Sequence, residues 1–137
     1  MIIQKIFLYV LLLGIPLLAG SGCAALLIGG GVGAGAGTVA YLKGELKSTE
    51  EASIDKTWQA AQETMKDLEF VITSKGKNTF SAKLIAYRAN DKKVEMYLQK
   101  ASENTTEVKI RVGVFGDESL SRIILESLKK HLFFPSK

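Results

Sequence analysis

The sequence predicts an α+β domain, a two-layer sandwich in which two helices cover one face of a four-stranded antiparallel meander. Two observations point to this fold: apolar residues recur at helical spacing over residues 54–68 and 120–132, and they alternate at period two in four segments between them. A third observation sets the boundary of the domain. Of the 18 basic and 14 acidic side chains, only Lys5 lies within the first 42 residues. We therefore predict a charged domain over residues 43–137, preceded by an export signal and a glycine-rich apolar segment.

Residues 1–22 have the three parts of a secretory signal peptide. Lys5 precedes an apolar run over residues 6–18, and small residues follow at 19–22. The apolar run is short for a membrane span, which needs about 20 residues. Cys23, the only cysteine, comes next, and its position resembles the bacterial lipoprotein box, although Gly20 stands where a branched aliphatic residue is usual. We predict that Cys23 is the lipidated first residue of the mature chain; the alternative is a buried cysteine within one long membrane segment.

Residues 24–42 carry no charge and contain Gly29, Gly33 and Gly37 at a spacing of four. On a helix this spacing places the three glycines on one face, where a second helix can approach closely. Two interpretations remain open: an apolar tether at the bilayer surface, and a glycine-zipper helix that inserts and forms a homo-oligomer. A phosphate-binding loop is disfavoured, because the Gly-Lys-Ser/Thr ending of such loops is missing.

The first helix of the domain is predicted after Ser53, which is a suitable N-terminal cap with Asp55 in the first turn. The apolar positions then follow at steps of three and four, as expected for a helix with one buried face. These positions are Ile54, Trp58, Ala61, Met65 and Leu68.

Four strands are predicted over residues 70–73, 80–87, 94–99 and 106–114. Apolar and polar residues alternate in them, which indicates one face turned to a core and one to water. The turns between them, at 75–78, 90–91 and 102–104, are too short for parallel crossovers, so the strands should be antiparallel.

The second helix is predicted after a turn at Gly116–Ser119, where Asp117 or Ser119 can cap it. His131 lies in the last turn beside two lysines, where we expect a solvated side chain that complements the helix dipole. Pro135 ends the helix. Its apolar stripe, at spacing four, consists of Leu120, Ile124, Leu128 and Leu132.

Catalytic and metal chemistry find little support in the residue types. One histidine and one cysteine are too few for a zinc site, and no cofactor motif is recognisable. A hydrolase built on Ser121 and His131 is the weakest alternative, since no motif joins the two. We predict a protein that is not an enzyme and that holds neither a metal nor a cofactor.

One face of the predicted sheet carries a candidate partner surface. Aromatic and basic residues share this face, but acidic residues are interspersed, so nucleic-acid binding is not expected. The face either binds an envelope protein or polymer, or is an ordinary solvated surface. Its candidate residues are Lys83, Tyr87, Tyr97, Lys109 and Arg111.

Residues 23–132 resemble a family of small, uncharacterised bacterial lipoproteins known only as a domain of unknown function. The resemblance is carried by the glycine-rich stretch after Cys23 and by residues 39–46, 58–61 and 110–121. It implies an envelope lipoprotein and brings no activity with it. By analogy with lipoprotein sorting, Ala24 after the cysteine favours the outer membrane, with the domain in the periplasm; the alternative is the inner membrane. The predicted function is a membrane-anchored binding or scaffolding module, and the alternative is a membrane protein that self-associates through residues 24–42.

Overall fold

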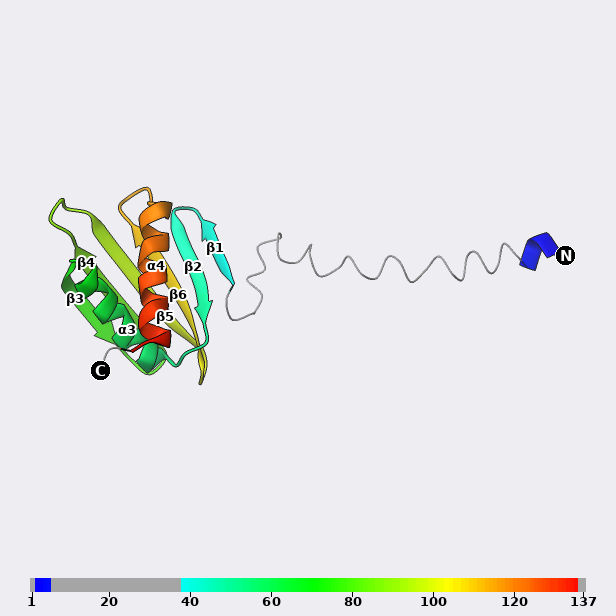
Figure 1. Ribbon diagram of the computed structural model, residues 1–137, viewed down its shortest axis with the longest axis horizontal. Coiled ribbons are helices and arrows are strands. Elements are labelled where there is room, and N and C mark those ends of the chain that lie inside the picture. Colours follow the sequence, from blue (N-terminus) through cyan, green and yellow to red (C-terminus); the bar gives the residue numbers. More distant parts are fainter. Residues whose placement is uncertain (1, 6–37, 136–137) are drawn as a thin grey trace. The chain divides into compact units, whose positions relative to one another are not determined.

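The computed structural model describes residues 2–5 and 38–135. Residues 2–5 are helical, and they belong to a different compact unit from the domain, which starts near residue 35. Within the domain, six strands and two helices follow one another along the chain (Figure 1). Their bounds are β1 Val39–Leu42, β2 Glu45–Glu50, α3 Ile54–Asp67, β3 Val71–Lys77, β4 Ser81–Tyr87, β5 Lys93–Ser102, β6 Thr105–Val112 and α4 Glu118–Phe133.

The strands form one sheet in the order β1-β2-β6-β5-β4-β3, and every neighbouring pair is antiparallel. The α+β class and the antiparallel pairing are therefore confirmed. The predicted number of strands is wrong, because the sheet within residues 38–135 has six strands and not four. The hairpin of β1 and β2 adds to the sheet beside β6, next to strands that follow each other in sequence from β3 to β6.

The first strand lies in a segment that the sequence assigned to the glycine-rich helix or tether. Val39–Leu42 is β1, and the turn to β2 is made by Lys43 and Gly44, whose φ angles are 53° and 80°. Positive φ at both central residues is the geometry of a type I′ hairpin turn. The predicted sites Cys23, Gly29, Gly33 and Gly37 lie outside the described residues. Within residues 2–5 and 38–135, no helix is long and apolar enough to cross a membrane.

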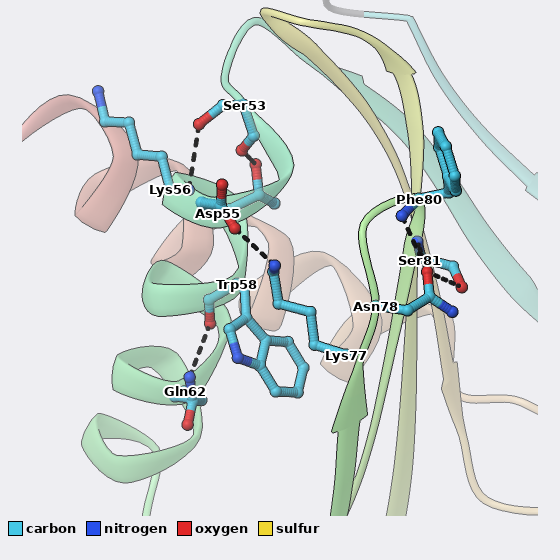
Figure 2. A network of polar contacts seen from close by, with 10 residues as sticks. Ser53, Asp55, Lys56, Trp58, Gln62, Lys77, Asn78, Phe80 and Ser81 are labelled. Atoms are coloured by element: carbon cyan, nitrogen blue, oxygen red, sulfur yellow. Dashed lines mark hydrogen bonds and ion pairs between the residues drawn. The ribbon is translucent and has the colours of Figure 1, made fainter.

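Both helices lie on the same face of the sheet (Figure 1). The caps form as the sequence predicts. The Ser53 side chain accepts a hydrogen bond from the Lys56 N–H at 3.2 Å (Figure 2). The Asp117 carboxylate accepts one from the Leu120 N–H at 3.0 Å. Each cap satisfies a backbone donor that the first helical turn leaves unpaired. The helices bury Ile54, Thr57, Ala60, Ala61, Thr64 and Met65 of α3, and Ser121, Ile124, Leu125, Leu128 and Leu132 of α4.

The core lies between the helices and the covered face of the sheet. Its centre is a row of four side chains, one from each of the neighbouring strands β4, β5, β6 and β2. The register of the sheet places each of these residues directly opposite the one on the adjacent strand. All four are at most 1% exposed, and each stabilises the fold by roughly 1.5–3 kcal/mol through burial. The row consists of Leu84, Met96, Ile110 and Leu46.

A few polar side chains are buried on this covered face. The Ser48 hydroxyl of β2 donates to the buried Glu50 carboxylate, and the Thr106 hydroxyl donates to the Ala52 carbonyl at 2.8 Å. These bonds offset the cost of removing polar groups from water. Two buried hydroxyls, those of Thr64 and Ser121, have no such partner among the residues described.

Strand β3 is longer than predicted, and the expected turn at 75–78 is wrong. Lys75 and Lys77 continue the strand and reach toward α3, where the Lys75 ammonium donates to the Gln62 side-chain oxygen at 2.9 Å. Lys77 pairs with Asp55 at 2.6 Å (Figure 2). The turn comes afterwards at Asn78, whose side-chain oxygen accepts from the N–H groups of residues 80 and 81, both at 2.8 Å.

Candidate interaction surface

The face of the sheet opposite the helices is called the open face below, because neither α3 nor α4 covers it. Strand alternation places side chains of four strands on it; most of them are half-buried, whereas Lys83 and Tyr87 are exposed. The register shows which of them are adjacent. Lys83 of β4 is opposite Tyr97 of β5, and Tyr97 is opposite Lys109 of β6.

All five residues predicted for the partner surface lie on the open face. Lys83, Tyr97 and Lys109 form one cross-strand row, and the Lys109 ammonium is 5.6 Å from the centre of the Tyr97 ring. This distance allows a cation–π attraction. Arg111 lies in the next row, and Tyr87 lies at the end of β4 opposite Lys93. The structure therefore brings three of the five together and leaves Tyr87 apart from them. Their binding of a partner stays a prediction.

The charges of the open face are paired along the strands. Ion pairs join residues two apart, from Lys93 to Glu95 at 2.6 Å and from Lys109 to Glu107 at 3.2 Å. The Tyr97 hydroxyl donates to the Gln99 side chain at 2.9 Å. Both signs of charge thus alternate over the face, an arrangement that favours a partner of mixed charge over a uniformly charged polymer.

Glu95 is the most strongly influenced carboxylate of this face. The hydrogen bond from Lys93 lowers the pKa of Glu95, and the positive charges of Lys93, Lys83 and Arg111 act in the same direction against burial. The same hydrogen bond raises the pKa of Lys93. Both groups are therefore charged at neutral pH, and the pair presents fixed charges at this end of the sheet.

Arg111 connects two loops at the end of the open face. Its guanidinium donates to the Lys43 carbonyl at 3.1 Å, in the turn between β1 and β2, and to the Val114 carbonyl at 3.4 Å, in the loop before α4. Gly44 and Gly116 bring the same loops into backbone contact. A Cβ on Gly116 would lie 2.5 Å from the Gly44 backbone, and one on Gly44 would lie 2.7 Å from the Phe115 carbonyl oxygen. Glycine is required at both positions because no side chain fits there.

Exposed apolar side chains lie on or directly beside these two connected loops. Leu42 is 48%, Val114 82% and Phe115 94% exposed, and these three residues are called the apolar rim below. Beside the rim is a hollow of about 280 Å³, lined by Val114, Gly113, Arg111, Glu95, Lys93 and the turn residues Lys92 and Asp91. The sequence pattern does not reveal the rim, because Val114 continues the alternation of β6. The signal for the end of the strand was Gly113, whose φ is 70°.

The structure corrects the prediction for His131. Its imidazole is not solvated: the side chain is 10% exposed and lies between two carboxylates of α3, with Nδ1 3.1 Å from Glu63 and Nε2 2.7 Å from Asp67. His131 thus joins the end of α4 to α3. Ser121 is fully buried and lies ten residues earlier on α4, about 15 Å along the helix axis. The two cannot form a nucleophile–base pair, which removes the hydrolase alternative built on them.

The part of the chain that the structure describes has no group of three or more histidine, cysteine or acidic side chains arranged to hold a metal ion.

Comparison with known families gives a match that includes both the N-terminal segment and the domain. The model of a family of proteins of unknown function, DUF3568, matches residues 5–131. The chain belongs to this family. The predicted resemblance to an uncharacterised family is thereby confirmed, while its lipoprotein character and the role of the glycine-rich segment stay predictions. No curated protein matches the chain.

Proposed function

We propose that this DUF3568 protein is a lipid-anchored protein of the bacterial cell envelope whose domain binds or scaffolds another envelope protein. The apolar rim is the observation that carries the binding role. Single exposed apolar residues are common on protein surfaces. Here three of them lie on or directly beside two loops that are fastened together, next to a hollow and at the end of a mixed-charge face.

The fastening of the loops matters for affinity. Arg111 and the close contact of Gly44 with Gly116 hold the rim in place before any partner arrives. A surface that is already ordered loses less conformational entropy on binding. Phe115 suits the role of an anchor, because aromatic side chains that insert into a partner's pocket contribute much of the energy of protein interfaces.

The chemistry of the surroundings defines the class of partner. Lys93, Glu95 and Arg111 line the hollow and carry charges of both signs. An apolar side chain flanked by acidic and basic groups would match the rim and the hollow together. This combination is found on proteins, whereas an envelope polymer of a single charge would meet as much repulsion as attraction.

Site-specific photo-crosslinking in living cells tests the binding role. A photoreactive amino acid at Phe115 should give a discrete crosslinked protein band, since this side chain would lie in the interface. The matched control is Ile123, which is exposed on α4, is not part of the rim and should give no such band. Equal bands from both positions, or a smear of polymer from Phe115, would contradict a protein partner at the rim.

The anchor is supported by the sequence: a signal peptide followed at once by the only cysteine, with Ala24 after it. Two or more acyl chains hold a protein stably at a membrane. Labelling with palmitate should mark the wild-type chain and not Cys23→Ser, and the variant should leave the membrane fraction. Unchanged label and unchanged fractionation would rule out the anchor.

The glycine spacing favours a second candidate, self-association of a membrane-inserted helix through Gly29, Gly33 and Gly37. Leucine at the central position would separate the two helices. Gly33→Leu should then abolish crosslinked oligomers, whereas an anchored module that only tethers its domain would be unaffected.

A further inference from the structure

Among the strands that the structure describes, β1 is the terminal strand on the side of the first hairpin, so within residues 38–135 no strand pairs with its outer edge. The direction of its backbone groups follows from one hydrogen bond. The Thr49 N–H donates to the Thr38 carbonyl at 3.2 Å, so these residues form a hydrogen-bonded pair. Bonded and non-bonded pairs alternate in antiparallel ladders. The N–H and C=O groups of Val39 and Tyr41 therefore point away from β2, toward the free edge.

The opposite edge of the sheet, β3, is protected against pairing. Its register shifts between Ile72 and Ser74, and Lys75 and Lys77 turn inward to bind α3. Bulges and inward-pointing lysines are devices by which natural sheets prevent edge-to-edge association. Strand β1 has neither: its register is regular, and the residues Val39–Leu42 carry no charge.

We propose that β1 pairs antiparallel with β1 of a second copy of this chain, around a two-fold axis that passes through Ala40. In this register Val39 lies opposite Tyr41 of the second copy and Tyr41 opposite its Val39. Val39 and Tyr41, whose backbone N–H and C=O groups point away from β2, then each form a hydrogen-bonded pair with the second copy. Each pair exchanges two backbone hydrogen bonds. The two sheets join with their covered faces on the same side, because Val39 and Tyr41 both pack against the core. Centring on Tyr41 would instead place Val39 opposite Lys43, which is in the turn.

The side chains of β1 suit this register. Ala40 meets its own counterpart in a non-bonded pair, where Cα atoms are only about 4.5 Å apart and a small side chain is favoured. The nearest charge on the open face, Lys47, is opposite Ala40 on β2 and so lies about three strand spacings, or roughly 14 Å, from its counterpart. A second copy therefore brings no like charges together. Leu42 becomes partly covered, while Val114 and Phe115 of the apolar rim stay exposed, so the pairing adds to the proposed function without replacing it.

Cysteine crosslinking of the full chain in membranes tests the register. Ala40→Cys should form a disulfide dimer on mild oxidation, because Cα atoms of bridged cysteines lie 4.4–6.8 Å apart, which includes the expected separation of about 4.5 Å. Leu42→Cys is the matched control on the same strand and face. In the proposed register its Cα atoms are more than about 13 Å apart, so it should give at least tenfold less dimer. The parent chain with Cys23 alone measures the background.

Opposite charges introduced at Ala40, the residue on the two-fold axis, distinguish a loss of specific pairing from misfolding. Ala40 points to the open face, so Ala40→Glu and Ala40→Lys should both fold. Co-purification of two differently tagged copies should fall at least tenfold for either variant alone and recover when the Glu and Lys variants are expressed together. Equal crosslinking of Ala40→Cys and Leu42→Cys, no dimer from Ala40→Cys, or no recovery in the mixed pair would overturn the proposal.

A last comparison distinguishes this edge from the glycine-rich segment. Ala40→Cys should crosslink as well in a Gly33→Leu background as in the wild-type background. Loss of the crosslink there would assign the association to the glycine segment and would overturn the pairing through β1. Neither outcome bears on the apolar rim, which is tested separately at Phe115.

Discussion

The two faces of the sheet are built from neighbouring residues and differ in almost every physical property. Ile110 is 1% exposed and lies beneath the helices, whereas Lys109, the residue before it, is on the open face and forms an ion pair with Glu107. On the covered face the side chains fit together and exclude water. On the open face they remain hydrated, and their charges are compensated locally. The stability of the fold therefore depends on one face, and the other is free to carry an interaction.

The largest effect is expected on the covered face. Ile110→Ala should lower the free energy of unfolding by about 2–5 kcal/mol, because it removes buried atoms and leaves a cavity among Met96, Leu46 and the helices. Urea unfolding followed by circular dichroism measures this change. A loss below about 1 kcal/mol would mean that the core collapses around the missing atoms or that the row is not the centre of the core.

The next largest effect is expected at the glycine contact below the rim. Gly116→Ala should cost about 2–3 kcal/mol, since its φ is 85° and the new Cβ would meet the Gly44 backbone. Gly113→Ala is the matched control: its φ is 70°, but a Cβ there has open space. The difference between the two variants in urea unfolding isolates the steric contact. Equal losses would show that the loops separate easily.

An effect of opposite sign is expected for a buried hydroxyl. Thr64→Val should raise the free energy of unfolding by about 1 kcal/mol, because it replaces an unpartnered buried hydroxyl by a methyl group of similar size. Thr57 provides the control, as it is equally buried on α3 but donates to the Ser53 carbonyl at 2.9 Å. Thr57→Val should therefore destabilise the protein. If both variants destabilise it equally, the Thr64 hydroxyl has a partner after all.

The pH dependence concerns the cap of α4. The hydrogen bond from the Leu120 N–H lowers the pKa of Asp117 first, and Lys92 lowers it further. A carboxylate whose folded pKa is depressed stabilises the fold above its unfolded pKa of about 3.9, and this contribution is lost as pH falls through the folded pKa. Urea midpoints measured from pH 6 to pH 2 should show this loss. Asp117→Asn, which still caps the helix but does not titrate, should flatten that part of the profile.

The smallest effect is expected on the open face. Lys109→Ala should change the free energy of unfolding by less than about 0.5 kcal/mol, because partly exposed ion pairs contribute little. The free energy of unfolding of Lys109→Ala is measured by urea unfolding under the same conditions as for Ile110→Ala. The difference between the two losses shows how much more the covered face contributes to stability than the open face. A loss above about 2 kcal/mol would mean that the open face also supports the fold.

Sequence patterns predict the parts of this fold in which the apolar period is unbroken. The stripe of α4 and the alternation in β4 to β6 are clear because apolar residues occupy nearly every covered position. Strand β2 was missed because two of its three covered positions are Ser48 and Glu50, which resemble a charged linker. The end of β3 was missed for a similar reason. Lys75 and Lys77 occupy covered positions but are charged, and the α3 residues that bind them are distant in sequence.

The candidate surface was predicted in part. Alternation alone placed Lys83, Tyr97 and Lys109 on one face, but it gave no information on the loops. The apolar rim depends on two turns, more than 70 positions apart, that meet through Gly44 and Gly116. His131 was misjudged for the same reason: Glu63 and Asp67 lie more than 60 positions away, and only tertiary packing brings them to the imidazole.

The contact of Gly44 with Gly116 also has a mechanical consequence. A force applied to the chain at Thr38 acts on the hydrogen bonds between β1 and β2 one residue pair after another, beginning at Thr38. Because these bonds break in sequence and not all at once, a small force is enough to separate β1 from β2. The separation reaches the turn at Lys43 and Gly44, where the backbone is packed against Phe115 and Gly116 and held by Arg111. We expect the separation to stop at this point, so that the five remaining strands keep their pairing. The hairpin would therefore yield under tension and recover, while the core behind it stays folded.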